Sequence, residues 1–530
     1  MSQEIKADYS QDFLFPPSLE DWVPPDHPVR FIRMFVDSLD LESLGFKSRE
    51  SVDGRPNYSN ELLLKVWLYG YFEKIYSNRD LEKACKVHLP LVWLTGLNFP
   101  DHNTIWRFFK NNGSFLKNVF SQSVHIAVKC GLVSLILQAV DGTKIFADVS
   151  KNRSVYLKDV KKILKKLDAS IDEVFEKISS HEISESESLE SSCIYSLPRE
   201  YQDKRKLKRL IDEGLEELSS EKRQELKRGL EAEIKKLEDA GLNQLNFTDR
   251  EARQMKTSSG SKSFCYNAQA VVDAEAQIIV GAKVSSDASD NHLLTEMIDE
   301  ASFNTGGVCE ESLADGGYFS GEQLQSASDK GYSVLVNMRA EIKGESKSGH
   351  GDSDSDSDID IDSDSDSEGD GLNFGKRAFC YDEKKDIYMC PAKKALKFER
   401  EKSSSNQSYR VRIYRCHHHK ECKHKELCSQ DKRGRSIERS PYEKAIEAQI
   451  KKQEDESKRA LLRKRKHIVE PVFGWIKNNN KFIRWTYRGL KSVEAQWQLI
   501  CTAINLKTLY GKWLAGVFDF KVFLEQQSPG

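Results

Sequence analysis

Residues 135–147, LILQAVDGTKIFA, decide how the rest of the chain is interpreted. The stretch is an apolar run that meets a carboxylate, and it predicts a strand that ends near Asp141. A second strand-like run, in SLADGGYFSGEQL, ends on Asp315. A carboxylate at the end of a buried strand is costly unless a cation compensates its charge. Asp-Gly is also a common turn signal, so Asp141 taken alone fits a turn better than a metal site.

A third carboxylate, Glu470, lies in a basic helical stretch, RKRKHIVEPVFGWIKNNNKFIRW. Taken alone, it fits an acidic residue in the first turn of a helix, with Pro471 near the start. Two strand-end aspartates together with a glutamate among cations are more specific. Oxygen ligands suit Mg²⁺ or Mn²⁺, and these three carboxylates would form a two-metal site for phosphoryl transfer on a nucleic acid.

At these residues the chain resembles the DDE transposases of bacterial insertion sequences. The motifs that carry the resemblance are, in chain order, DHPVRFIRMFVDSLDL, RPNYSNELLLKVWLYGYF, SNRDLEKA, FPDHNTIWRFFK, VDGTKI, GSKSFCYNAQAVVD, LADGGYFS and HIVEPVFGWIK. They extend from about residue 15 to residue 510. The resemblance implies an α/β fold with a ribonuclease H-like core, large insertions in that core, and an N-terminal all-helical DNA-binding domain.

The resemblance also implies an activity, the metal-dependent cleavage and strand transfer of transposon-end DNA. Asp141, Asp315 and Glu470 would be its catalytic residues and would hold two Mg²⁺ or Mn²⁺ ions. The implied partners are double-stranded DNA, both terminal inverted repeats and target DNA, and further copies of the chain in a homodimer or higher synaptic complex. Two alternatives stay open: a DNA-binding regulator derived from a transposase, and a metal-dependent endonuclease that does not join strands.

The predicted elements divide the chain into five parts. These are an N-terminal helical domain (1–130), a catalytic core (131–148, 262–340 and 437–515), a charged helical insertion (149–261), an acidic disordered linker (341–375) and a cysteine-rich insertion (376–436). In the helical insertion, apolar residues at helical spacing over 201–241 predict a helical hairpin, and a solvated arm is favoured over a dimer contact or a DNA clamp.

Charge and composition are consistent with an intracellular DNA-binding protein. The net charge of −2 includes residues 351–370, which hold ten acidic and no basic residues, and without them the chain carries +8. The N-terminal segment is polar, and no run approaches the ~18 apolar residues of a membrane span. We therefore expect a cytoplasmic protein associated with the bacterial nucleoid.

The eleven cysteines are odd in number, and five of them fall within residues 380–428. This clustering favours a metal site in a reducing compartment over disulfides. Cys390, Cys416, Cys422 and Cys428 predict one structural zinc site, with His419 as an alternative ligand. The competing interpretation is a set of reduced cysteines beside a surface histidine run.

Two groups of cations are predicted to contact DNA. Arg107 and Lys110 would lie on the last helix of a helix-turn-helix, although an ordinary bundle with Trp106 and Phe109 in its core fits as well. The second group surrounds Glu470 and consists of Arg463, Arg465, Lys466, Lys477, Arg484 and Arg488.

Related transposases carry a Tyr-Arg-Glu-Lys signature around this glutamate. Lys477 matches its lysine, but Arg463 and Lys466 replace its tyrosine and arginine. Seven residues make about two helical turns, so Lys477 is expected to point the same way as Glu470.

Overall fold

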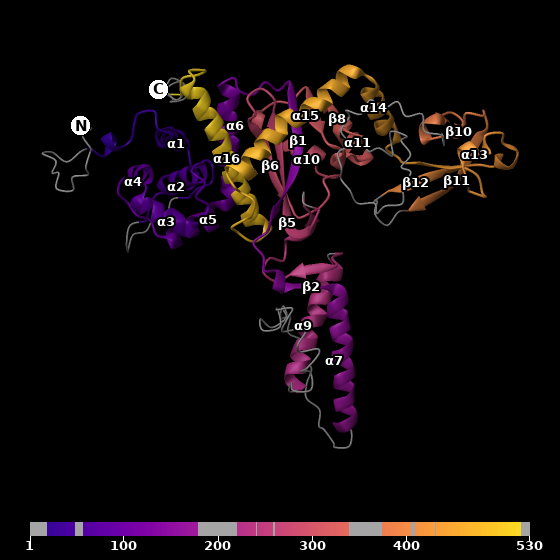
Figure 1. Ribbon diagram of the computed structural model, residues 1–530, viewed down its shortest axis with the longest axis horizontal. Coiled ribbons are helices and arrows are strands. Elements are labelled where there is room, and N and C mark those ends of the chain that lie inside the picture. The colour runs from indigo at the N-terminus through magenta and orange to yellow at the C-terminus, as the bar shows by residue number, and fades with distance from the viewer. Residues whose placement is uncertain are drawn as a thin grey trace, which may run out of the picture.

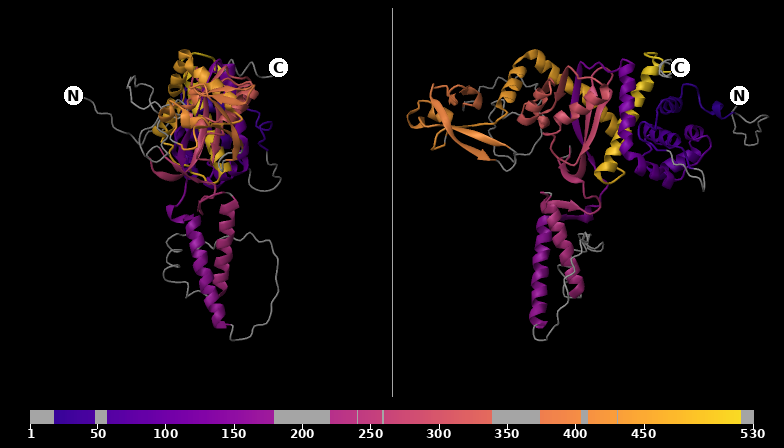
Figure 2. Two further views of the ribbon diagram at one scale, coloured as in Figure 1. Left: turned by 90° about the vertical axis from the view of Figure 1, so that its right-hand side faces the viewer. Right: turned by 180° about the vertical axis from the view of Figure 1, so that it is seen from behind.

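The computed structural model describes residues 18–47, 57–178, 220–239, 241–257, 260–338, 374–403, 409–429 and 431–520. It is a mixed α/β protein (Figure 1). A helical N-terminal part lies on one side of a central sheet, a small β module lies on the other side, and a helical hairpin projects away from the sheet (Figures 1 and 2).

The N-terminal part is helical, as its apolar spacing predicts. Its elements are η1 (Leu19–Trp22), α1 (Pro28–Asp37), α2 (Asn60–Phe72), α3 (Asn78–Val87), α4 (Leu89–Leu94), α5 (His102–Asn112), η2 (Gly113–Phe115) and α6 (Leu116–Lys129). Helix α5 starts where Asp101 accepts a hydrogen bond from the Thr104 N–H, which satisfies one of the free donors of its first turn. The buried Trp67 of α2 packs against Phe109 of α5, so α2 is the centre of this part.

The central sheet is built around strand β1 (Leu137–Phe146). One edge of β1 pairs antiparallel with β5 (Lys262–Asp273), and the other pairs parallel with β7 (Glu311–Ala314). Beyond these strands lie β8 (Val334–Val336), parallel to β7, and β6 (Ile279–Ser285), antiparallel to β5. The short strand β4 (Arg253–Lys256) pairs with the first residues of β5.

The order of strands and helices in this sheet agrees with the sequence prediction. Helix α10 (Leu294–Thr305) connects β6 to β7, and α11 (Gly321–Asp329) connects β7 to β8. One prediction was wrong, because β1 does not end near Asp141. The strand continues for five residues to Phe146, and Gly142 pairs with Gln269 of β5, so the Asp-Gly dipeptide is not a turn.

The helical insertion forms a hairpin on its own small core. After η3 (Lys151–Arg153), β2 (Ser154–Tyr156) pairs with β3 (Gln244–Asn246), and between them α7 (Leu157–Ile178) packs on α9 (Ser220–Asp239). Only part of the hairpin predicted for residues 201–241 lies within the described residues. Its second half is α9, whose partner among the described residues is α7, and its first half lies outside them.

The cysteine-rich part is a five-stranded antiparallel sheet with short helical turns. Its elements are η7 (Lys376–Ala378), β9 (Cys380–Asp382), β10 (Ile387–Met389), β11 (Ala395–Ser403), β12 (Arg410–Cys416), η8 (His419–Glu421), α13 (Lys425–Cys428) and β13 (Ser436–Arg439). Almost all of the predicted acidic linker lies outside the described residues.

Three helical elements return the chain to the central sheet. They are α14 (Glu443–Glu454), α15 (Glu456–Gly474) and the π-helical turn η9 (Trp475–Asn479). Helix α15 crosses β1, β5 and β7, and the last helix, α16 (Leu490–Leu514), packs between β6 and the helices α2 and α6. Within the described residues, no helix combines the length and the apolar character that a membrane span requires.

Candidate active site

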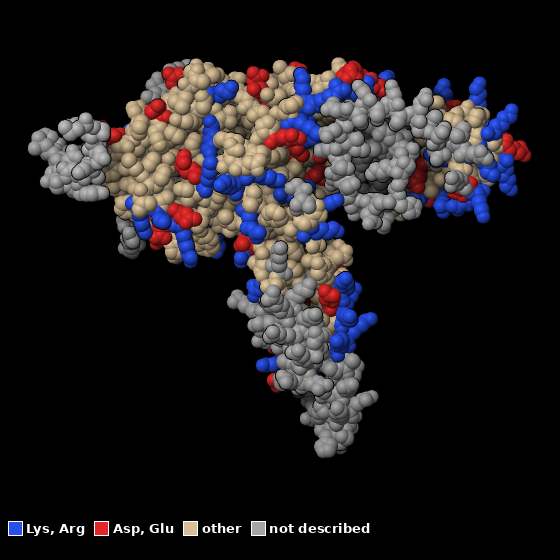
Figure 3. All heavy atoms as spheres, viewed as in Figure 1, with Lys and Arg blue, Asp and Glu red and all other residues tan. Residues whose placement is uncertain are grey.

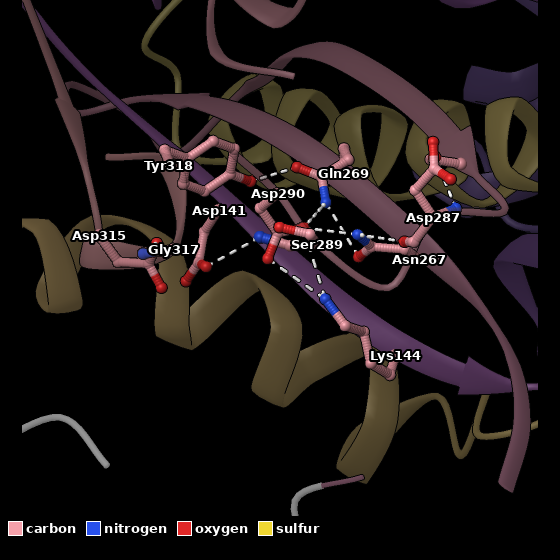
Figure 4. Close-up of polar contacts among 12 residues, drawn as sticks. Asp141, Lys144, Asn267, Gln269, Asp287, Ser289, Asp290, Asp315, Gly317 and Tyr318 are labelled. Carbon is pink, nitrogen blue, oxygen red and sulfur yellow. Dashed lines mark hydrogen bonds and ion pairs between the residues drawn. The ribbon is translucent and has the colours of Figure 1, made fainter. Parts of the chain in front are cut away.

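Asp141 and Asp315 lie at neighbouring positions of two parallel strands. Val140 of β1 stands opposite Ala314 of β7, so the residue that follows each of them is one of the two aspartates. Asp315 begins the short turn η6 (Gly316–Tyr318), where its Oδ1 accepts a hydrogen bond of 2.9 Å from the Gly317 N–H. Figure 4 shows the two carboxyl groups side by side.

The carboxyl group of Asp141 is largely buried, which has two electrostatic consequences. Burial raises its pKa to about 7, and the charge of Asp315 adds to this effect. Arg465 of α15 opposes it, since its Nη1 lies 2.9 Å from Asp141 Oδ2 and its side chain is only 8 % exposed. The paired aspartates therefore form a carboxylate site in which negative charge is poorly solvated, and such a site favours a bound cation.

Glu470 is not brought to this pair. It lies on α15 and its side chain is exposed, whereas Arg465 on the same helix faces Asp141. Among the described residues, no three His, Cys, Asp or Glu side chains stand close enough together to hold a metal ion. The structure thus joins two of the three predicted carboxylates, and Glu470 stays on the solvent side of the helix that covers them.

Pro471 lies inside α15, so the alternative in which it starts a helix is wrong. A proline there has no N–H for the carbonyl oxygen of His467 one turn earlier. Gln277, in the turn between β5 and β6, donates its Nε2 to that oxygen at 3.1 Å. The carbonyl group left without a helical hydrogen bond therefore binds Gln277, which attaches α15 to the turn of the sheet near Glu470.

Lys477 and Glu470 differ in exposure, although their spacing predicts that they point the same way: Glu470 is exposed and Lys477 is half-buried. The chain from Trp475 to Asn479 forms a π-helical turn, which holds more residues per turn than an α-helix and changes the direction of the side chains. Lys477 is half-buried; burial lowers its pKa, and the nearby Asp141 raises it. Its ammonium group thus interacts electrostatically with Asp141, while Glu470 faces solvent.

A polar network connects the two aspartate strands to the loop before α10 (Figure 4). The Tyr318 hydroxyl donates to Gln269 Oε1, and Gln269 Nε2 donates to Asp290 Oδ1 at 2.8 Å. Asn267 also donates to Asp290 Oδ1, and the Lys144 ammonium group lies 3.2 Å from Asp290 Oδ2. Asp290 is therefore a third carboxylate beside the site, and its charge is paired with a lysine of β1.

Gly142 makes this network possible. A Cβ added at Gly142 would lie less than 3.0 Å from Gln269 Nε2 and 3.1 Å from Asn267 Oδ1. The side chain of Gln269 thus crosses β1 through the space that a larger residue would fill. The glycine after Asp141 is explained by this packing and not by a turn.

The other cations predicted to contact DNA differ in how accessible they are. Arg107 and Lys110 are exposed on α5, and the Lys110 ammonium group lies 5.0 Å from the ring of Trp106, which is itself 40 % exposed. Around Glu470, the exposed members are Arg463, Arg484 and Arg488, while Lys466 is half-buried. Arg465 differs from the prediction, because its burial and its pairing with Asp141 remove it from the surface.

The four predicted zinc ligands of the cysteine-rich part line one cavity, although no three of these described side chains stand close enough in the structure to hold a metal ion. Cys390, Cys416, Cys422 and Cys428 surround a volume of about 20 Å³ together with His419. Burial raises the pKa of the Cys416 and Cys428 thiols. Cys380, by contrast, is exposed and does not line the cavity.

Two family models match the chain. One, described as "Transposase DDE domain", covers residues 389–510, and the other, described as "Transposase domain (DUF772)", covers residues 17–111. Together they indicate an insertion-sequence DDE transposase. The first match includes Glu470 and most of the cysteine-rich part, whereas Asp141 and Asp315 lie outside both. No curated protein and no solved structure matches the chain.

Three residues of the site were not predicted from the sequence: Gln269, Asn267 and Asp290. The first two carried a usable signal, since they are fully buried polar residues in the otherwise apolar stretch CYNAQAVV. Polar side chains in a buried strand need partners, which predicts a network close to the strand they face. Asp290, in a polar loop sequence, carried no such signal.

Proposed function

We propose that the protein cleaves transposon-end DNA and transfers its strands, with divalent metal ions as cofactors. The observation that carries the proposal is the juxtaposition of Asp141, on β1, with Asp315, directly after the end of the parallel strand β7, and Asp141 is largely buried. Carboxylates gathered at the ends of neighbouring strands are a common arrangement for sites in α/β sheets.

The same proposal assigns roles to the parts of the chain. Residues 131–148, 262–340 and 437–515 form a ribonuclease H-like catalytic core, and residues 1–130 form a DNA-binding domain. The exposed Arg107 and Lys110 on α5 support the second assignment. Strand transfer needs two DNA ends in one complex, so the active form is a homodimer or a higher synaptic assembly.

Asp141 and Asp315 fit a divalent ion, because oxygen ligands suit Mg²⁺ and Mn²⁺ and because added positive charge would relieve the poorly solvated pair. Two such ions are proposed, and the resemblance adds Glu470 to their ligands. Bound divalent ions in sites of this kind activate a water or hydroxyl nucleophile and stabilise the leaving oxygen.

The chain's own residues would prepare the site for that chemistry. Arg465 holds one oxygen of Asp141 at 2.9 Å and so orients the carboxyl group. Lys477 places a half-buried ammonium group close to Asp141, where it would receive a phosphate of the bound strand.

The test compares three single substitutions with two controls. Asp141→Asn, Asp315→Asn and Glu470→Gln should each nearly abolish cleavage of end DNA and leave DNA binding largely intact. Asp287→Asn and Glu494→Gln, which change carboxyl groups outside the proposed triad, should cleave at near-normal rates. Near-normal cleavage by one of the first three variants would remove that residue from the catalytic set.

Product analysis separates the competing functions. A transposase joins a cut 3′ end to target DNA, an endonuclease only cuts, and a regulator binds without cutting. Paired ends incubated with target DNA and Mg²⁺ should therefore yield joined products. Cutting without joining would favour the endonuclease.

A structural zinc ion is proposed in the cysteine-rich part. The backbone N–H of Lys394 donates to Cys390 Sγ at 3.2 Å, and the backbone of His418 donates to Cys416, and such bonds stabilise thiolates. His419 Nε2 lies 2.8 Å from the Lys432 carbonyl oxygen, so it carries the proton, and the buried Nδ1 has no hydrogen-bond partner. A histidine whose second nitrogen is held by a carbonyl group is arranged as metal ligands usually are.

Metal analysis of the untagged protein should find about one zinc ion per chain, as expected for a closed four-ligand site. Cys422→Ser should lower the zinc content, whereas Cys380→Ser, which removes an exposed thiol outside the cavity, should not. Zinc-free protein in which all four cavity thiols react freely would show that the cysteines are merely reduced. His419→Gln, compared with His418→Gln, tests whether the histidine takes part.

A further inference from the structure

Helix α7 has two faces of opposite character in the part whose side chains are described. Val160, Ile163 and Leu167 are buried against the leucines of α9. The other face carries five exposed lysines, Lys158, Lys161, Lys162, Lys165 and Lys166. At 100° per residue these lysines fall within one sector of the helix, opposite the apolar face.

This lysine stripe, defined by those five residues, has little opposite charge on it: Asp159, in the first turn, lies at its edge and is half-buried. Lys161 pairs with Glu238 of α9 at 2.6 Å, and Lys158 lies near the ring of Tyr156. Helix α9 differs, because its exposed positions mix both signs. Its exposed charged residues are Glu221, Lys222, Glu225, Arg228, Glu231, Lys235, Lys236, Glu238 and Asp239. An exposed face that only needs solvation is expected to look like α9.

The lysine stripe also costs stability. Three pairs of lysines stand four residues apart, namely 158 with 162, 161 with 165, and 162 with 166. Each like-charge pair at this spacing destabilises a helix by about 0.2–0.5 kcal/mol. A stripe that opposes folding in this way is better explained by a polyanionic partner than by solubility.

The position of the hairpin indicates which polyanion this is. The hairpin follows β1, the strand of Asp141, and it extends away from the central sheet (Figures 1 and 2). At its base, Arg484 donates to the Ala147 carbonyl oxygen at 3.2 Å and Arg488 pairs with Asp148 at 2.8 Å. Both arginines are exposed and belong to the proposed DNA-contacting set, and Figure 3 shows Lys and Arg side chains along one edge of the hairpin.

We infer that the lysine stripe of α7 binds the phosphate backbone of duplex DNA that extends beyond the active site. The inference rests on the proposed DNA-processing function and adds a contact surface to it. From Lys158 to Lys165 the stripe rises about 10 Å, which spans about three phosphates of one strand at 3.4 Å each. The contacts would be independent of sequence, because lysine reads phosphates as point charges.

The test removes charge from one helix at a time in the full-length protein. The stripe variant is Lys158→Gln, Lys162→Gln and Lys165→Gln, and the matched control is Lys222→Gln, Arg228→Gln and Lys235→Gln on α9. Both remove three positive charges from the same hairpin. Binding to a long duplex of unrelated sequence is measured over a range of salt concentrations.

The slope of log K against log salt should fall by about 2 to 3 in the stripe variant, since each phosphate contact contributes about 0.9. The control variant on α9 should change the slope by at most about one third of the change expected for the stripe variant. The stripe variant should also unfold at a slightly higher denaturant concentration than the wild type, because the lysine repulsion is gone. Weaker DNA binding together with higher stability cannot come from a damaged fold.

Equal losses of affinity in the two variants would overturn the inference, as would an unchanged salt slope in the stripe variant. Failure of the proposed function has a different signature. In that case the wild-type protein itself does not cleave end DNA, or Asp141→Asn cleaves as well as the wild type.

Discussion

The substitution Gly142→Ala tests whether the polar network beside Asp141 depends on the missing side chain. Gly142 pairs with Gln269 across β1 and β5, and a new Cβ would come within 3.0 Å of Gln269 Nε2 and Cδ. The backbone is not the obstacle, since Gly142 does not adopt a positive φ. The whole effect should therefore come from the displaced glutamine.

The magnitude follows from what Gln269 holds. Its side chain is fully buried, accepts from Tyr318 and donates to the carboxylate of Asp290. Overpacking typically costs about 1–3 kcal/mol. Losing a hydrogen bond to a charged group adds about 1.5–3 kcal/mol to this cost. Alanine has less conformational entropy than glycine in the unfolded chain, which offsets about 0.5–1 kcal/mol. We expect Gly142→Ala to destabilise the protein by about 1.5–5.5 kcal/mol and to reduce cleavage.

Urea denaturation of single and double variants is the assay. In a Gln269→Ala background only Asn267 Oδ1, at 3.1 Å, remains close to the new methyl group, so Gly142→Ala should cost less than about 1 kcal/mol there. Gly511→Ala on α16, where an added Cβ has no neighbour within 4 Å, serves as the control and should stabilise slightly. An equal cost of Gly142→Ala in both backgrounds, or no cost in the wild type, would refute the reasoning.

Three further predictions concern other parts of the structure. Burial raises the pKa of Glu300 to about 7 from 4.5, so the folded chain keeps a proton that the unfolded chain has lost and stability falls as pH rises between these values. Glu300→Gln should therefore stabilise by about 3 kcal/mol near pH 8 and change little near pH 4, measured by urea denaturation at each pH. Asp290→Asn should reduce cleavage. The double variant with Lys144→Ala should cleave about as slowly as Asp290→Asn alone, because both substitutions break the same ion pair between Lys144 and Asp290. Additive losses in a cleavage assay would contradict this. Lys477→Ala should lower both cleavage and the salt slope of DNA binding more than Lys481→Ala on the exposed neighbour, and equal effects would rule out a special role for Lys477.

Much of the sheet could be predicted from the sequence because its strands are apolar runs with clear limits. The stretches that became β5, β6, β7 and β8, and the intervening helix α10, follow local periodicity and end at polar turns. Local pattern also placed Asp315 at the end of its strand. It failed at Asp141, where a turn-like dipeptide lies inside a strand, because pairing of Asp141 and Gly142 with β5 outweighs the turn preference of Asp-Gly.

The composition of the active site was harder to predict because most of its contacts join distant segments. Asp290 meets Lys144 from 146 positions away, and Arg465 meets Asp141 from 324 positions away. A basic residue in a helix looks the same in the sequence whether it faces DNA or a buried carboxylate. Arg465 is buried and its neighbour Arg463 is exposed only because of how α15 packs across β1, which the sequence does not reveal.

Two irregularities, Pro471 inside α15 and the π-helical turn after it, explain how this segment both packs on the sheet and places side chains near Asp141. Pro471 removes one helical hydrogen bond, and Gln277 takes the free carbonyl group, which fixes the helix to the sheet at that level. Four residues later the π-helical turn reorients the chain, so that Lys477 lies near Asp141 although Glu470 does not. A regular α-helix would carry Glu470 and Lys477 on nearly one stripe. The π turn therefore shifts Lys477 away from the stripe of Glu470 and contributes to its position near Asp141.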